Sequence, residues 1–273
     1  MKNFKLLEHD KISVDGHTLY RIEATRNFGD VKRGDVGGYV ESLDNLSENA
    51  WVYEDALVYG NARAFDNAKV FGNARVFGNA HLFGDSSVFG NAQVYNDAFV
   101  FDNAKVFGNA RVSQDAQVSG DAQVFGNTWV CQDARVFRNA QVYGNSRVFG
   151  NAQVYGDAKI YGNASVSGNT WVCGNARVFG DANVFGDATI IKGSVKGVRD
   201  VITISSNGVL YSITILPKHI QIGCQCHSRS AWFRFTDDEI RKMDGERAVV
   251  WWKTWKPILK AICDANASGG EQC

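Results

Sequence analysis

The chain repeats a six-residue unit without insertion or deletion from Val52 to Thr189, which gives 23 hexads of the form V-[FY]-G-[ND]-A-x. The first position is Val in 20 hexads, and the fifth is Ala in all but four. These two columns are separated by two residues in A-x-V, which is the period of a β-strand, so each hexad predicts a short strand whose Ala and Val face inward. Gly at the third position and Asn or Asp at the fourth tolerate positive φ, so each strand should end in a turn.

Units this short can bury their interior only by stacking on one another, which predicts a parallel β-helix. The small-plus-aliphatic hexads resemble the hexapeptide-repeat left-handed β-helix family of bacterial transferases. The resemblance implies a left-handed solenoid with three hexads per coil, hence about eight coils and a rod roughly 40 Å long. The chain departs from that family in placing Phe or Tyr where the family often has Gly. We therefore expect a mainly β fold with a β-helix over residues 46–195.

The two flanking segments lack the repeat and should cover the open ends of the solenoid. Residues 1–45 are expected to form an N-terminal β-hairpin and cap, with the hairpin turning at Asp15 and Gly16. Residues 196–273 are expected to form a small C-terminal α+β domain. That domain should begin with two or three strands that turn at residues 206–208 and 217–218.

Helices should follow these strands. Thr236, followed by three acidic residues, is typical of a helix N-cap. Pro257 is expected to kink or split the last helix. The apolar face of that helix is expected to consist of Val250, Trp251, Trp255, Ile258, Leu259 and Ile262.

Charge and cysteine content exclude several classes of protein. Basic and acidic residues balance at 29 each, so no global field favours duplex nucleic acid or an anionic membrane. The sequence has neither a secretory h-region nor an apolar run long enough to span a bilayer. The cysteines show no disulfide-framework spacing: Cys131, Cys173, Cys224, Cys226, Cys263 and Cys273. We expect a soluble cytoplasmic protein with reduced thiols, in the host cytoplasm if it is phage-encoded.

With three hexads per coil, residues 18 apart should stack, and one face then carries an aromatic residue in every coil. The column consists of Tyr53, Phe71, Phe89, Phe107, Phe125, Tyr143, Tyr161 and Phe179. Three interpretations stay open: the rings stack on each other, they form a homo-oligomer interface, or they bind a ligand. The interface interpretation, a trimer or dimer, rests on Phe71, Phe89, Phe107, Phe125 and Tyr143. The ligand interpretation rests on Lys69, Lys105, Phe107, Lys159, Tyr161 and Arg177.

A ligand on this face would be a small anionic aromatic molecule such as a nucleotide, because rings and cations recur there at coil spacing. A competing location is a cleft between the solenoid and the C-terminal domain. The residues expected to line that cleft are Trp232, Trp251, Trp252 and Trp255.

The sequence offers little support for catalysis or a metal. An acyltransferase of the resembled family needs a general base and loops that build a pocket, but the repeats carry one histidine, His81, and no inserted loop. Cys224, Cys226 and His227 lack the spacing of a structural zinc site. In two "NTWVC" motifs, Trp129 and Trp171 each precede a small residue and should lie on different faces. We expect no catalytic residues, no metal and no cofactor.

The segments "GGYVE" and "LSENAWVY" resemble the N-terminal part of uncharacterised bacterial and phage-borne β-solenoid proteins, and the C-terminal tail resembles domains of phage accessory proteins. These resemblances favour a non-enzymatic binding protein that sequesters a host molecule or a host protein. Two alternatives stay open: an acyltransferase that uses acyl-CoA, and a self-associating structural rod.

Overall fold

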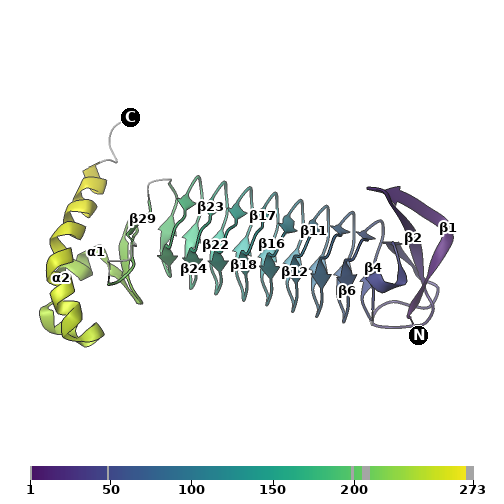
Figure 1. Ribbon diagram of the computed structural model, residues 1–273, viewed down its shortest axis with the longest axis horizontal. Helices are drawn as coiled ribbons and strands as arrows, with labels where there is room; N and C mark the ends of the chain where they lie inside the picture. The colour runs from purple at the N-terminus through teal and green to yellow at the C-terminus, as the bar shows by residue number, and fades with distance from the viewer. Residues whose placement is uncertain (1, 48, 198–199, 205–209, 269–273) are drawn as a thin grey trace.

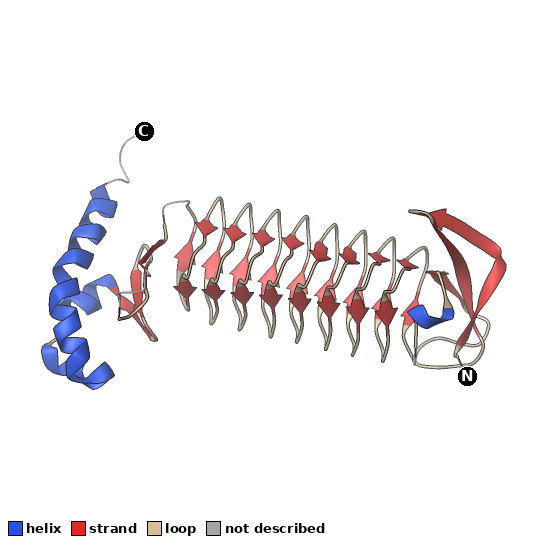
Figure 2. Cartoon of the chain, viewed as in Figure 1, coloured by secondary structure: helices blue, strands red, loops and turns tan. Residues whose placement is uncertain are grey.

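The protein is a mainly β parallel β-solenoid with a small C-terminal domain. The computed structural model describes residues 2–47, 49–197, 200–204 and 210–268. Figure 1 shows a rod of stacked coils between an N-terminal hairpin and a C-terminal domain of sheet and helices. Figure 2 shows that the α-helices lie at the C-terminal end. The predicted fold class is confirmed.

Three parallel sheets form the walls of the rod, and within each sheet residues 18 apart pair, as Val88 does with Val70 and Val106. The nine-stranded sheet consists of β4 (Trp51–Val52), β7 (Lys69–Val70), β10 (Ser87–Val88), β13 (Lys105–Val106), β16 (Gln123–Val124), β19 (Gln141–Val142), β22 (Lys159–Ile160), β25 (Arg177–Val178) and β28 (Ser194–Val195). The eight-stranded sheet consists of β6 (Arg63–Ala64), β9 (His81–Leu82), β12 (Phe99–Val100), β15 (Gln117–Val118), β18 (Arg135–Val136), β21 (Gln153–Val154), β24 (Trp171–Val172) and β27 (Thr189–Ile190).

The third wall is an eleven-stranded sheet that also includes the N-terminal strands. It consists of β1 (Phe4–Val14), β2 (His17–Ala24), β3 (Val36–Val40), β5 (Leu57–Val58), β8 (Arg75–Val76), β11 (Gln93–Tyr95), β14 (Arg111–Ser113), β17 (Trp129–Val130), β20 (Arg147–Val148), β23 (Ser165–Val166) and β26 (Asn183–Val184). Trp129 and Trp171 therefore lie on different sheets, as predicted.

The columns of the repeat have the predicted roles. The residues at the first and fifth positions are buried along the whole rod. The third position has positive φ in every hexad, also where the residue is not Gly, as at Asp102 and Gln114. The Gln114 side chain accepts a hydrogen bond from the Gln132 N–H of the next coil at 2.8 Å. Asparagines at the fourth position form ladders, in which for example Asn109 donates to Asn127 at 2.9 Å. Each coil is thus bonded to the next through both backbone and side chains.

The N-terminal segment covers the open end of the solenoid. Strands β1 and β2 form the predicted antiparallel hairpin, and Asp15 and Gly16 at its turn have φ of 53° and 85°. Strand β3 leads from this hairpin into the rod by pairing in parallel with β5. After it, Asn45 in the 3-10 helix η1 (Leu43–Asn45) donates hydrogen bonds to the carbonyl groups of Gly60 and Ala62. Backbone acceptors at the first coils are therefore satisfied by a side chain.

At the other end, the last coil is covered by an antiparallel sheet of β29 (Ile202–Ile204), β30 (Ile213–Ile215), β31 (His219–Ile222) and β32 (Gln225–Ser228). The Thr189 N–H of the last coil donates to the hydroxyl of Thr214 at 3.0 Å. The turn predicted at residues 217–218 is confirmed, and the turn predicted at 206–208 lies outside the described residues. The expectation of two or three strands was wrong, because Gly223 (φ 54°) allows a tight turn that produces a fourth strand.

Two helices, α1 (Arg229–Arg234) and α2 (Asp237–Ser268), pack against this sheet. Thr236 is the predicted N-cap, since its hydroxyl accepts from the Glu239 N–H while the Glu239 carboxylate accepts from the Thr236 N–H. The helix is not split at Pro257: its break lies at Asp244 and Gly245, where φ is −156° and 73°.

The predicted apolar face of α2 was wrong for two residues. Val250 is 63% exposed and Ile258 is 44% exposed. The helix instead buries Val249, Trp252, Leu259 and Cys263 against the sheet. These four residues are spaced three, seven and four apart, which follows the helical period, and Val250 and Ile258 fall outside the face that they form.

Candidate functional site

The residues predicted to bind a ligand or form an interface all lie along the nine-stranded sheet. From Phe71 to Phe179 their rings form six consecutive parallel stacks with centroids 4.7 to 5.0 Å apart. The rings are half-buried, and Lys105 beside Phe107 is exposed. Lys69 is paired with Asp30 at 3.0 Å. The first of the three interpretations, stacking of the rings on each other, therefore describes the arrangement within the chain.

This geometry limits what the nine-stranded sheet can bind. Because each ring face inside the column lies against the neighbouring ring, a nucleotide base would meet only ring edges. Lys159 and Arg177 lie in successive coils, and Lys105 lies three coils before Lys159, with Gln123 and Gln141 between them. Ligand binding and self-association through this face stay predictions.

Of the other chemistry-bearing residues, His81, Cys226 and His227 are partly buried, whereas Cys224 is exposed. His81 stacks on Phe99 with centroids 5.3 Å apart. His227 packs edge-on against Trp232, and burial lowers its pKa. Burial likewise raises the pKa of the Cys226 thiol. Among the described residues, no group of three or more His, Cys, Asp or Glu is arranged to hold a metal ion.

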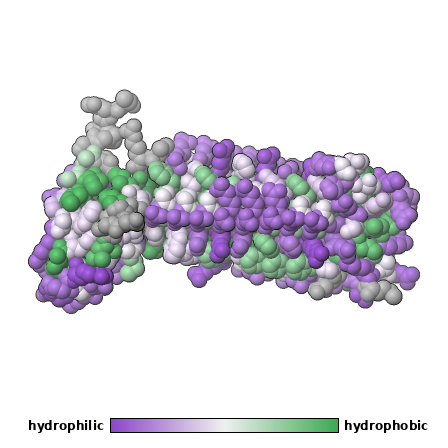
Figure 3. All heavy atoms as spheres, in the orientation of Figure 1, coloured by the Kyte–Doolittle hydropathy of each residue, from purple (hydrophilic) through white to green (hydrophobic). Residues whose placement is uncertain are grey.

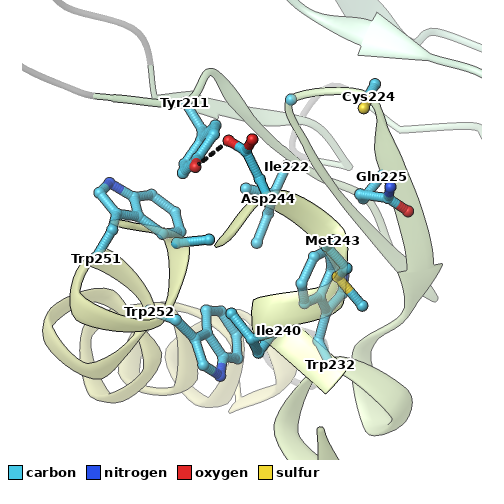
Figure 4. A pocket seen from close by; sticks show the side chains of 12 residues that line it. Tyr211, Ile222, Cys224, Gln225, Trp232, Ile240, Met243, Asp244, Trp251 and Trp252 are labelled. Carbon is cyan, nitrogen blue, oxygen red and sulfur yellow. Dashed lines mark hydrogen bonds between the residues drawn. The ribbon is translucent and has the colours of Figure 1, made fainter. Parts of the chain in front are cut away.

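An apolar cavity of about 250 Å³ lies inside the C-terminal domain, between the antiparallel sheet and the helices. Its lining comes from β31, β32, α1, α2 and the segment before β30, and consists of Tyr211, Ile222, Gly223, Cys224, Gln225, Trp232, Ile240, Met243, Asp244, Ala248, Trp251 and Trp252. Figure 4 shows Trp251 on one side of the cavity and Met243 on the other, with Trp252 and Ile240 next to each other below them. The walls are aromatic and aliphatic, and the cavity opens to solvent.

The break in α2 makes room for this cavity. Residues before the break contribute Ile240 and Met243, and residues after it contribute Ala248 and the two tryptophans. Gly245 supplies the left-handed conformation that lets the chain change direction there. A small residue, Ala248, also lines the cavity.

One polar pair lies at the edge of the cavity. The Tyr211 hydroxyl donates a 2.5 Å hydrogen bond to the Asp244 carboxylate (Figure 4). Burial and this bond raise the pKa of Tyr211, so the hydroxyl stays protonated at neutral pH. Arg247 lies 4.0 Å from the same carboxylate. Asp244 is the only lining residue with a formal charge, and a ligand entering the cavity would meet it as a hydrogen-bond acceptor.

The cavity includes three of the four tryptophans predicted for a cleft. Trp232, Trp251 and Trp252 line it, whereas Trp255 stacks on Trp251 outside it. The sequence predicts a cleft between the solenoid and the C-terminal domain. The cavity instead lies within the C-terminal domain. Tyr211, Met243 and Asp244 were missed. The dipeptide Asp-Gly at 244–245, inside an otherwise helical pattern, is the signal that would have placed a break next to them.

Comparison with known proteins concerns the repeats. Three segments of the solenoid, residues 116–132, 140–156 and 158–174, match the family model described as the YdcK beta solenoid repeat. These segments lie within the part of the rod that the structure shows as stacked coils. No curated protein matches the chain. The similarity thus supports a β-solenoid, and it does not extend to the C-terminal domain that contains the cavity.

The surface differs between the rod and the C-terminal domain. In Figure 3, hydrophilic residues run in rows along the rod, and hydrophobic residues gather on the C-terminal domain at the left. In the described part of the chain, no helix has the length and apolar character needed to span a membrane.

Proposed function

We propose that this protein is a non-enzymatic binding protein in which the solenoid carries a ligand-binding C-terminal domain. The observation that supports this proposal is the apolar cavity lined by Trp232, Trp251 and Trp252. A packed protein interior leaves few voids larger than a water molecule. An open cavity with rigid aromatic walls and one carboxylate at its edge has the composition of a small-molecule site.

The size of the cavity indicates the size of its ligand. A dry cavity of about 150 Å³ is enough to hold benzene, and sites for drug-sized molecules begin at about 300 Å³. A volume of about 250 Å³ therefore suits one ring with a short substituent, or one apolar side chain of a partner protein. A donor group on that ligand would bond to Asp244.

The remaining parts of the proposal come from the sequence. The protein acts in the cytoplasm, of the host if it is phage-encoded, and captures a host molecule or host protein. It self-associates as a dimer or trimer through the aromatic column of the nine-stranded sheet. The acyltransferase alternative requires acyl-CoA, so calorimetric titration with acetyl-CoA distinguishes it from a binding protein. Binding of acetyl-CoA together with acetylation of an acceptor would show that the protein is an acyltransferase.

The cavity is tested by thermal unfolding of the full-length chain with a panel of single-ring aromatic and short alkyl compounds. A compound at 100 times its Kd adds about 2.7 kcal/mol, which corresponds to a rise of roughly 10 °C or more for a domain of this size. Ala248→Leu fills the cavity and should abolish the rise. Ala261→Leu, the same change at an exposed position of α2, should leave it intact.

Two results would overturn the proposal. One is that no compound stabilises the wild type. The other is that the stabilising compounds act equally on Ala248→Leu, which would place their binding elsewhere.

A further inference from the structure

We infer that the protein has a second binding site, for a neutral polyhydroxylated ring such as a saccharide unit, in the groove between the eight-stranded sheet and the C-terminal sheet. The groove has a volume of about 550 Å³. Its lining consists of Tyr155, Asn169, Trp171, Cys173, Asp187, Thr189, Ile191, Ser212, Gln221, Gly223 and Cys224. Gly223 and Cys224, at the turn between β31 and β32, line both this groove and the apolar cavity.

Trp171 provides an open aromatic surface in the groove. Its side chain is 47% exposed although its strand, β24, lies in the middle of paired neighbours. Trp129 occurs in the same "NTWVC" motif, but its indole N–H donates to the Ser113 hydroxyl of the preceding coil at 3.2 Å. The two tryptophans thus share a local sequence, and Trp171 in addition lines a groove formed by two parts of the chain.

Gln221 supplies a buried acceptor that lacks a partner. Its side chain is 1% exposed, and its amide N–H donates to the Gly223 carbonyl at 2.6 Å. Its Oε1 atom has no hydrogen-bond partner among the described residues. Reversing the amide would place two acceptors 2.6 Å apart, so the orientation is fixed. A buried acceptor of this kind is destabilising unless a water molecule or a ligand donates to it.

The other polar groups of the groove indicate a ligand with hydroxyl donors and no negative charge. Asp187 is the only lining residue with a formal charge, and it accepts from the Asn169 amide at 2.9 Å. The carboxylate repels phosphates and other anions. A pyranose ring fits these features, since its C–H face packs on an indole while its hydroxyl groups donate to the Gln221 and Asp187 oxygens.

The test uses the labelled full-length protein on a printed array of mono- and oligosaccharides, followed by calorimetric titration of the strongest sugar. The wild type and Trp129→Ala should bind the same sugars. Trp171→Ala should weaken binding at least tenfold, and Gln221→Leu should also weaken it. Because Gln221→Leu also removes the hydrogen bond to the Gly223 carbonyl, thermal unfolding of this variant is measured to show that it still folds.

Absence of any bound sugar would overturn this inference, and so would an equal loss in Trp129→Ala and Trp171→Ala. Ala248→Leu should still bind the sugars, because it fills only the cavity of the C-terminal domain. The two sites can therefore fail independently.

Discussion

Replacing Phe107 by Ala should weaken the middle of the rod, because this ring stacks on both neighbours. Its centroid lies 4.7 Å from those of Phe89 and Phe125, with the planes within 4° of parallel. Two ring pairs contribute about 1–3 kcal/mol together, and burial of half a Phe side chain contributes about 1 kcal/mol more. We therefore expect a loss of about 2–4 kcal/mol.

Hydrogen exchange measured by mass spectrometry is the suitable assay, because stability in a solenoid is local to each coil and its neighbours. Peptides covering residues 89–125 should exchange roughly 30-fold to several hundred-fold faster in Phe107→Ala than in the wild type. Phe185→Ala is the matched control: that ring ends a column, is 61% exposed and has no stacking partner among the described residues. Its flanking coils should change less than tenfold. Equal effects of the two substitutions would refute the assigned role of the stacked rings.

Two further predictions concern the ends and the faces of the rod. Hydrogen bonding from Lys69, opposed by burial and aided by the Tyr53 hydroxyl, lowers the pKa of Asp30. Because the pKa is lower in the folded state, ionised Asp30 stabilises the folded state at pH values above its unfolded-state pKa of about 3.9. This stabilisation is lost as the pH falls through the folded-state pKa. Limited pepsin digestion from pH 5 to pH 2 should therefore cleave residues 2–40 before the coils, and simultaneous cleavage of both would contradict this. Separately, replacing Phe89, Phe107 and Phe125 by Ser should convert a homo-oligomer into soluble monomers, as measured by light scattering. A wild type that is already monomeric would show that the predicted interface does not form.

The sequence predicts the solenoid well because its constraints repeat. Each hexad must bury its first and fifth residues and turn at a position that accepts positive φ, and the same columns recur in all 23 hexads. An atypical residue in one coil therefore does not hide the pattern, because the neighbouring coils repeat it. The hairpin turn at Asp15 and Gly16 was equally predictable, since it depends on two adjacent residues.

The C-terminal domain was harder to predict because its packing joins elements that differ from one another. In the part of α2 that follows the break at Gly245, Val250 is exposed while Trp252 is buried, and this depends on where the sheet lies relative to the helix. The cavity follows from that break and from the small side chain of Ala248 between large neighbours. Periodicity contains no information on such spaces, which arise only once the sheet and both parts of the helix are assembled.

Binding of a ligand in the C-terminal cavity can be followed through the indole N–H resonances of the seven tryptophans. The compound that gives the largest thermal stabilisation is titrated into ¹⁵N-labelled full-length protein. We predict that the resonances of Trp232, Trp251 and Trp252 shift in a saturable manner, while those of Trp51, Trp129 and Trp171 do not move. Shifts confined to the tryptophans of the solenoid, or no saturable shift at any tryptophan, would contradict the account.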